Sequence, residues 1–228
     1  MFLRQISKDS MLYAVIAAPL LAGCFFRFAI PQIESLLCNY FGKAAILSEY
    51  YLLFDLFLAV LTPYMLCFAS SMVILTEYDE NMVSYMAVTP VEKRGYIVSR
   101  LVLPVAVSLF LSVALMALFS LTQWSIERML LVCFLSGILS VTEALMVVSF
   151  SRNRVEGMAL AKLTGILMLG LPVPFFLFSG IQYLFSVLPS FWIAKLFKEG
   201  NYLLILPALF TSAVWSWLLY GRFEKKLS

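Results

Sequence analysis

Apolar residues in this sequence fall into six long blocks that are separated by short polar connections. The blocks cover residues 11–30, 52–75, 101–121, 129–150, 163–181 and 202–220. A helix needs about 20 residues to cross a hydrocarbon core about 30 Å thick, because it rises about 1.5 Å per residue. The pattern therefore predicts an all-α, polytopic membrane protein with six transmembrane helices.

The connections between the blocks are too short to hold a separate soluble domain, since the longest has about 25 residues. The chain of 228 residues is 63% hydrophobic and 13% charged. Soluble domains are about half apolar and about a quarter charged. We therefore expect residues 1–228 to form a single transmembrane domain.

Basic residues predict how the chain is oriented. With a cytoplasmic N-terminus, the segments on the cytoplasmic side carry 11 Lys and Arg residues and the segments outside carry five. The positive-inside rule applies to short loops and so places both termini in the cytoplasm. The basic residues are split between several segments at a membrane surface, which favours contact with anionic lipid and not with nucleic acid. We expect a multi-pass protein of the cell membrane, in a bacterium the inner membrane.

Several kinds of catalytic and metal-binding chemistry are excluded by what the sequence lacks. It has no histidine, the commonest catalytic base and metal ligand. The four cysteines have no CxxC spacing and are expected to pack as small apolar residues. No GxxxxGKS or GxxxxGKT phosphate-binding loop occurs. We therefore expect no catalytic residue, metal site or cofactor on this chain, and any ATP must be bound by a partner.

The polar connection between the second and third blocks has the pattern of a short cytoplasmic helix. Thr76 is placed to cap this helix, and Pro90 ends it because the residue before a proline leaves the α region. The acids of the first turn, which face the positive end of the helix dipole, are Glu77, Asp79 and Glu80. One mostly apolar stripe follows at helical spacing, formed by Met82, Tyr85, Met86 and Thr89. A protein partner explains this helix better than anionic lipid, which would repel its acids.

The same connection carries a resemblance to a known family. Its residues are Glu77, Tyr78, Asp79, Glu80, Asn81, Met82, Val83, Ser84, Tyr85, Met86, Ala87, Val88, Thr89, Pro90 and Val91, then Gly95, Tyr96, Ser99 and Arg100. They resemble the coupling region of the membrane subunits of type-2 ABC exporters, especially the six-span permeases described as drug or fluoroquinolone export permeases. The likeness extends more weakly to Pro19, to the six spans and to the loop from Leu188 to Trp192.

The resemblance implies a division of labour between subunits. This chain would be the permease subunit of an ATP-driven exporter and would pair with a second six-span permease, identical or different. Two separate ATPase subunits would bind ATP and Mg and would receive the cytoplasmic helix. The residues implied to contact the ATPase are Glu77, Asp79, Glu80, Met82, Tyr85, Met86, Thr89 and Pro90. Closing of the ATPases would move this helix and switch the spans between two arrangements.

Polar residues inside the fourth block are candidates for lining the transport path. Ser136, Ser140 and Glu143 share one helix face, on which small residues let another helix approach closely. Glu143 lies too deep to reach the headgroups easily. It either makes a structural bond, for example to Arg152 or Arg100, or contacts substrate or works in gating. Asp55 is only three residues into the second block, so we expect it at the membrane interface and assign it no chemistry.

The fifth block contains two prolines that interrupt its helix. Pro172 and Pro174 lack an amide donor and clash with the preceding turn, so we expect a kink or unwound segment near the middle of the membrane. The apolar stretch from residue 175 to 197 is broken by Gly180 and Pro189. A short helical excursion that dips back from the outer face, as the resemblance implies, fits this stretch better than an exposed loop.

Two other functions stay open on the sequence alone. A secondary transporter would need ligands for a coupling ion at mid-membrane, often within inverted repeats, and no internal repeat is visible. An intramembrane enzyme would need a convergent nucleophile and base, and without histidine it is the weaker alternative. The sequence leaves open the substrate, the strict direction of transport and whether the two permease subunits are identical.

Overall fold

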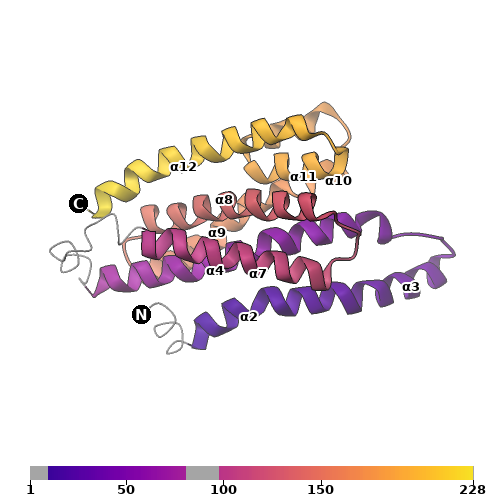
Figure 1. The fold of residues 1–228 in the computed structure, drawn as a ribbon, viewed down its shortest axis with the longest axis horizontal. Coiled ribbons are helices and arrows are strands. Elements are labelled where there is room, and N and C mark those ends of the chain that lie inside the picture. The colour runs from indigo at the N-terminus through magenta and orange to yellow at the C-terminus, as the bar shows by residue number, and fades with distance from the viewer. Residues whose placement is uncertain (1–9, 81–97, 228) are drawn as a thin grey trace.

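The computed structural model describes residues 10–80 and 98–227 (Figure 1). This part of the chain is helical and contains no strand. Its helices are α2 (Ser10–Cys24), α3 (Ile30–Phe41), α4 (Tyr51–Asp79), α7 (Leu103–Phe119), α8 (Ile126–Phe150), α9 (Arg154–Thr164), α10 (Val173–Phe176), α11 (Pro189–Glu199) and α12 (Ile205–Leu227). Shorter π-helical and 3-10 segments join several of them, at Phe25–Ala29, Ser48–Tyr50, Val98–Val102, Gly165–Gly170, Gly180–Val187 and Tyr202–Leu204.

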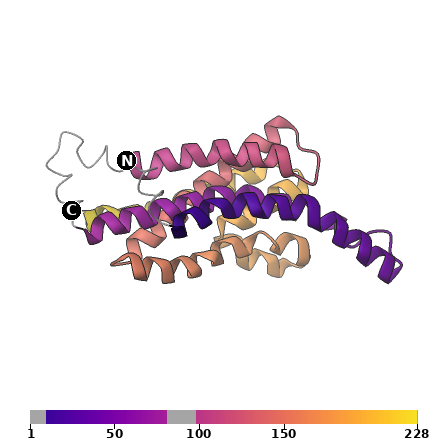
Figure 2. The same cartoon turned by 90° about the horizontal axis from the view of Figure 1, so that it is seen from below.

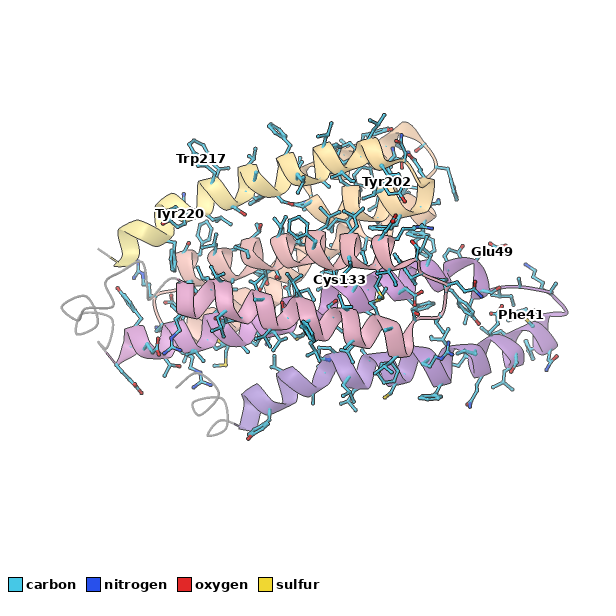
Figure 3. All side chains as sticks on the ribbon, in the orientation of Figure 1. Phe41, Glu49, Cys133, Tyr202, Trp217 and Tyr220 are labelled. Carbon is cyan, nitrogen blue, oxygen red and sulfur yellow. The ribbon has the colours of Figure 1, made fainter. Side chains whose placement is uncertain are left out.

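Helices α4 and α8 form the centre of the bundle, where they pack against each other over most of their length. Helix α2 packs on α4, and α12 packs on α8 (Figure 1). Helices α7 and α9 both contact the central pair, from opposite sides (Figure 2). The outer helices expose large apolar side chains such as Phe110 of α7 and Trp217 of α12, and Figure 3 shows Trp217 projecting outward. Such a surface suits lipid or another apolar subunit and not water.

The bundle has two ends, which we call the base and the tip. At the base, the backbone N–H of Arg154 donates to Asp79 (3.0 Å) and the guanidinium of Arg222 lies over the ring of Phe150 (4.7 Å). At the tip, the ring of Tyr50 stacks on that of Phe176 with centroids 5.1 Å apart. Helix α12 ends and α2 begins toward the base (Figure 1).

Within the described residues, five helices are long and apolar enough to cross a membrane: Ala17–Phe41, Ser48–Asp79, Arg100–Phe119, Ile126–Phe150 and Tyr202–Phe223. The expected fifth span at residues 163–181 is not one of them, because its helix is broken. The first span is longer than the expected 11–30, since α2, a π-helical turn and α3 continue one another to Phe41. The second runs past the expected end at residue 75.

The broken segment nevertheless runs alongside α4 from base to tip. Gly157 packs on Leu75 near the base, and a Cβ at this glycine would overlap the Leu75 side chain. Further along, the hydroxyl groups of Tyr64 and Thr164 are 2.6 Å apart. The segment reaches the tip at Phe176, whose ring stacks on Tyr50. Residues 154–176 therefore pass the whole bundle as α9, a 3-10 segment and α10.

The chain then dips back from the tip into the bundle. The indole N–H of Trp215 donates to the carbonyl of Val187 (2.9 Å), and Trp215 lies ten residues, or about 15 Å, along α12 from Ile205. The side chain of Ser190 donates to the carbonyl of Leu167, within the 3-10 segment that follows α9. Helix α11 then returns to the tip, where Phe197 contacts the ring of Trp124.

Prolines inside α4 and α7 are tolerated because each helix supplies a serine to the other. Pro63 has no amide to donate to the carbonyl of Ala59, and Ser112 of α7 donates to that carbonyl instead (3.1 Å). Pro104 likewise releases the carbonyl of Arg100, to which Ser70 of α4 donates. Between helices that face lipid and not water, such donors decide whether a proline can be accommodated.

The expectation that Thr76 caps a new helix is wrong. Thr76 lies inside α4, and its hydroxyl donates back to the carbonyl of Met72 (2.8 Å). Glu77 and Asp79 belong to the last turn of α4, and Glu80 is its C-cap residue. The helix continues because no proline or glycine interrupts it here and because Glu77 finds a buried partner. Met82, Tyr85, Met86, Thr89 and Pro90 lie outside the described residues.

The Ser112 hydrogen bond can be tested with a double-mutant cycle. We expect Ser112→Ala to lower the free energy of unfolding by about 0.6 kcal/mol, the average measured for hydrogen bonds between membrane helices, and by no more than about 1.7 kcal/mol, the largest measured value. The loss should shrink in a Pro63→Ala background, because the introduced alanine supplies an amide for the Ala59 carbonyl. Ser108→Ala is the matched control, since the hydroxyl of Ser108 bonds only within its own helix, to Val105. Equal losses with and without Pro63 in thermal unfolding in detergent would contradict this account.

Candidate functional site

The base of the bundle is organised by a buried ion pair between Glu77 and Arg100. The guanidinium of Arg100 donates to both carboxylate oxygens of Glu77, and one of these bonds is 3.1 Å long. Both side chains are buried. Two parallel donors make this the strong, geometrically specific form of the Arg–carboxylate contact. The pair joins the end of α4 to the start of the α7 segment and so fixes both ends of the connection between them.

The two other acids at the end of α4 are exposed. Asp79 accepts a hydrogen bond from the backbone N–H of Arg154 and so holds the first turn of α9. Glu80, the C-cap residue, makes no hydrogen bond from its side chain to any described residue. Of the three acids expected to contact a partner, Glu77 is therefore occupied inside the bundle. Glu80 is exposed, and its carboxylate, unlike that of Asp79, is not engaged by α9.

A second polar region lies in the middle of the bundle, between α4, α8 and α9. It contains the three expected path residues of α8, and all three are buried: Ser136, Ser140 and Glu143. Ser140 accepts a hydrogen bond from the thiol of Cys67 on α4 (3.2 Å). The small-residue face does permit close approach, since a Cβ at Gly137 would overlap the Leu109 side chain of α7.

Glu143 does not make the expected bond to Arg152 or to Arg100. Neither of its carboxylate oxygens has a hydrogen-bond partner among the described residues. Arg100 is engaged by Glu77, and Arg152 is exposed beyond the end of α8. The expected structural bond to one of these arginines is therefore absent from the described part of the chain. The side chain itself is fully buried.

The α-helix is interrupted before the prolines that were expected to break it, because α9 ends at Thr164 and the 3-10 segment Gly165–Gly170 follows. Pro172 comes after this segment, and Pro174 is the second residue of α10. The carbonyl groups of this irregular region are met by side chains. The ammonium of Lys198 donates to the carbonyl of Pro174 (2.6 Å), and the indole of Trp192 donates to that of Ser186 (2.7 Å). These bonds fasten α11 to the segments around it.

Asp55 organises the tip, a role that the sequence did not suggest. Its carboxylate accepts hydrogen bonds from the backbone N–H groups of Leu121 and Thr122 (2.7 and 2.9 Å) and from the indole of Trp124 (2.9 Å). The side chain is buried although it lies near the first residue of α4. The α7–α8 loop is thereby held on α4. No local pattern in the sequence indicated this contact, because Leu121 lies 66 residues from Asp55 along the chain.

The sequence is similar to those of known proteins over nearly its whole length. Residues 2–221 match a family profile described as "Fluoroquinolones export permease protein Rv2686c-like". The chain belongs to this permease family. It is similar to two proteins of Mycobacterium tuberculosis named fluoroquinolones export permease protein, MT2760 of strain CDC 1551 / Oshkosh and Rv2686c of strain ATCC 25618 / H37Rv. Each is 24% identical over 234 residues, which cover 98% of this chain and 91% of the relative. No solved structure matches the chain.

Membership of the Rv2686c-like family and the several apolar helices of membrane length make the chain a multi-pass membrane permease of an export system. Its buried acids then have distinct surroundings. Asp55 and Glu77 are fully partnered at the two ends of the bundle, and Glu143 is unpartnered by described residues in the middle. No group of three or more metal-ligating side chains occurs in residues 10–80 and 98–227.

The role of Asp55 can be tested in this permease by Asp55→Asn. The amide keeps the size of the side chain but places an NH2 group against N–H donors, so we expect a loss of about 1–3 kcal/mol in unfolding free energy. Glu49→Gln is the matched control, because Glu49 is an exposed acid at the same end of the bundle (Figure 3). Thermal unfolding in detergent measures both. A variant as stable as the control would show that Asp55 does not hold the tip.

Proposed function

We propose that this chain is the permease subunit of an ATP-driven, type-2 ABC exporter in the cell membrane, the inner membrane if the organism is a bacterium. One observation carries the proposal: the export-permease family profile covers residues 2–221, nearly the whole chain. The chain carries no nucleotide-binding loop of its own. ATP and Mg would be bound by two separate ATPase subunits, and a second six-span permease, identical or different, would complete the path. The permease itself would be non-catalytic.

In the proposed topology the chain crosses the membrane six times with both termini in the cytoplasm. The fifth crossing is the broken segment 154–176, whose packing along α4 from base to tip supports it. The base is then the cytoplasmic end. The dip of residues 177–199 from the tip would be a re-entrant excursion from the outer face, acceptable in lipid because protein side chains meet its carbonyls.

Coupling to the ATPases would pass through the connection between α4 and α7. Its stripe residues Met82, Tyr85 and Met86 remain the proposed contact surface, together with the exposed charges of Asp79 and Glu80. Glu77 would act differently. Its buried pair with Arg100 ties both ends of the connection together, so that a displacement of the connection reaches α4 and α7 jointly. The relatives' name makes fluoroquinolones the first compounds to test as cargo.

The function is tested by co-expressing the chain with an ATPase encoded by a neighbouring gene and measuring co-purification and drug accumulation in cells. An exporter of the proposed kind should co-purify with the ATPase, and its export should stop with vanadate or with a Walker-lysine variant of that ATPase. Export that instead stops with a proton uncoupler while vanadate has no effect would identify a secondary transporter.

Charge reversal at Glu80 tests the coupling surface. We expect Glu80→Lys to reduce ATPase recovery or stimulation about two- to fivefold, the effect of an exposed charge contact worth up to about 1 kcal/mol. Glu80 is the right position because Asp79 also holds α9 and Glu77 is buried. Glu49→Lys, the same change at the tip, should leave both quantities unchanged. Equal recovery for the two variants would place the ATPase contact elsewhere.

A further inference from the structure

Glu143 has an environment that neither other buried acid has. Asp55 and Glu77 each accept several hydrogen bonds from named donors. Glu143 is equally buried, yet both of its oxygens lack a partner in the described part of the chain. An unpartnered buried charge is costly, because a low-dielectric interior cannot replace the water that the carboxylate has lost. A charged Glu143 would therefore lack the partners that Asp55 and Glu77 have.

The polar side chains around Glu143 cannot complete it, since their protons are already used. The hydroxyl of Ser140 donates to the carbonyl of Gly137 (2.7 Å), and the thiol of Cys67 donates to Ser140. The hydroxyl of Thr164 donates to Ala161 (2.8 Å), so the hydroxyl of Tyr64 must be the donor in its contact with Thr164. The acceptor capacity of this region exceeds its supply of donors. A donor or a positive charge for the carboxylate form of Glu143 would have to come from outside the cluster.

No basic side chain of the surrounding helices supplies that partner. Helix α4 contains no lysine or arginine, and Arg100 before α7 is held by Glu77 at the base. On α8, Arg128 lies at the tip against the carbonyl of Phe197. Lys162 of α9 is exposed, and Arg222 of α12 lies at the base over the ring of Phe150. The titratable groups that do face Glu143 from α4 are Tyr64 and Cys67, and neither carries a positive charge.

We propose that Glu143 is the recognition point for the positive charge of an organic-cation cargo, which rests on the proposed function as an exporter. In the closed bundle the carboxyl group holds a proton. When the bundle opens, the proton passes to water and the carboxylate pairs with the cationic group of the cargo. The apolar body of the cargo lies against the buried aliphatic and aromatic residues around it. Ionisable residues inside a membrane commonly mark substrate or ion paths.

The seam between α4 and α9 is the side from which the site can open. Tyr64 and Thr164 contact each other across this seam, and Tyr64 lies close enough to Glu143 to interact with it electrostatically. One residue beyond Thr164, the α-helix gives way to the 3-10 segment Gly165–Gly170. A movement of α9 about this break would separate the two hydroxyls and expose the carboxyl group, while the α4–α8 contact stays in place.

The proposal is tested by ligand binding to the full-length permease with its ATPase in nanodiscs. The probes are tetraphenylphosphonium and tetraphenylborate, ions of similar size and apolar surface but opposite charge. We expect wild type to prefer the cation and Glu143→Gln to weaken binding of the cation about tenfold or more, with binding of the anion unchanged. Glu143→Asp should keep the preference. Glu127→Gln, which removes an exposed acid from the tip end of the same helix, should bind as wild type.

A measurement on wild type alone gives an independent answer if Glu143→Gln fails to assemble. A proton and the cation compete for one carboxylate, so affinity for tetraphenylphosphonium should fall as the pH is lowered, and affinity for tetraphenylborate should not. The proposal is overturned if the affinity for tetraphenylphosphonium does not change with pH. It is also overturned if wild type and an assembled Glu143→Gln variant bind this cation equally well. Co-purification with the ATPase is scored on the same samples. Its loss in wild type would count against the exporter itself, separately from the cargo site.

Discussion

A backbone carbonyl that loses its helical donor inside this bundle must find another donor in the protein, because lipid and packed side chains offer none. The fold depends on how this is done. Helices α4 and α7 each contain an internal or early proline, and each provides the serine that meets the carbonyl released in the other, Ser112 for Ala59 and Ser70 for Arg100. In the broken region beyond α9, side chains of α11 and α12 play the same part, as with Lys198 and Trp215. Irregular backbone is thereby confined to places where a neighbouring helix covers it.

Buried carboxylates likewise need hydrogen-bond donors from elsewhere in the protein. Asp55 gathers N–H donors from the α7–α8 loop and fixes the tip, and Glu77 takes the guanidinium of Arg100 and fixes the base. Both are therefore structural centres although they are charged groups in an apolar bundle. Glu143 gathers nothing from the described residues, because the hydroxyls nearest to it already donate to backbone carbonyls or to one another. Asp55 and Glu77 therefore stabilise the fold, whereas Glu143 is the acid that we propose to bind a ligand.

In the proposed exporter these two kinds of site would work together. The ion pair at the base and the exchanged serines join α4 and α7 into one unit, so a movement imposed on their cytoplasmic connection would travel along both helices. Helix α9 is attached to α4 separately, through Asp79 at its start, the packing of Gly157 on Leu75 and the Tyr64–Thr164 contact further along. If α9 moved as a unit against the joined pair, the bundle would change between two arrangements without unpacking its centre.

By itself the sequence determined the all-helical membrane class, four of the six expected apolar helices to within several residues, a broken helix in the fifth block and the permease family, because hydrophobic length, proline chemistry and local motifs are all read along the chain. It failed where a residue's role is set by a distant partner. Thr76 looked like a helix cap and Glu77 like a surface acid, but Arg100, 23 residues away, draws Glu77 inside and α4 continues. Asp55 looked interfacial, but the loop at Leu121–Trp124 buries it. Only the tertiary structure decided which serine meets which proline gap and which buried acid stays without a donor, since hydrogen-bond partners across helices depend on register and packing that no single stretch of sequence encodes.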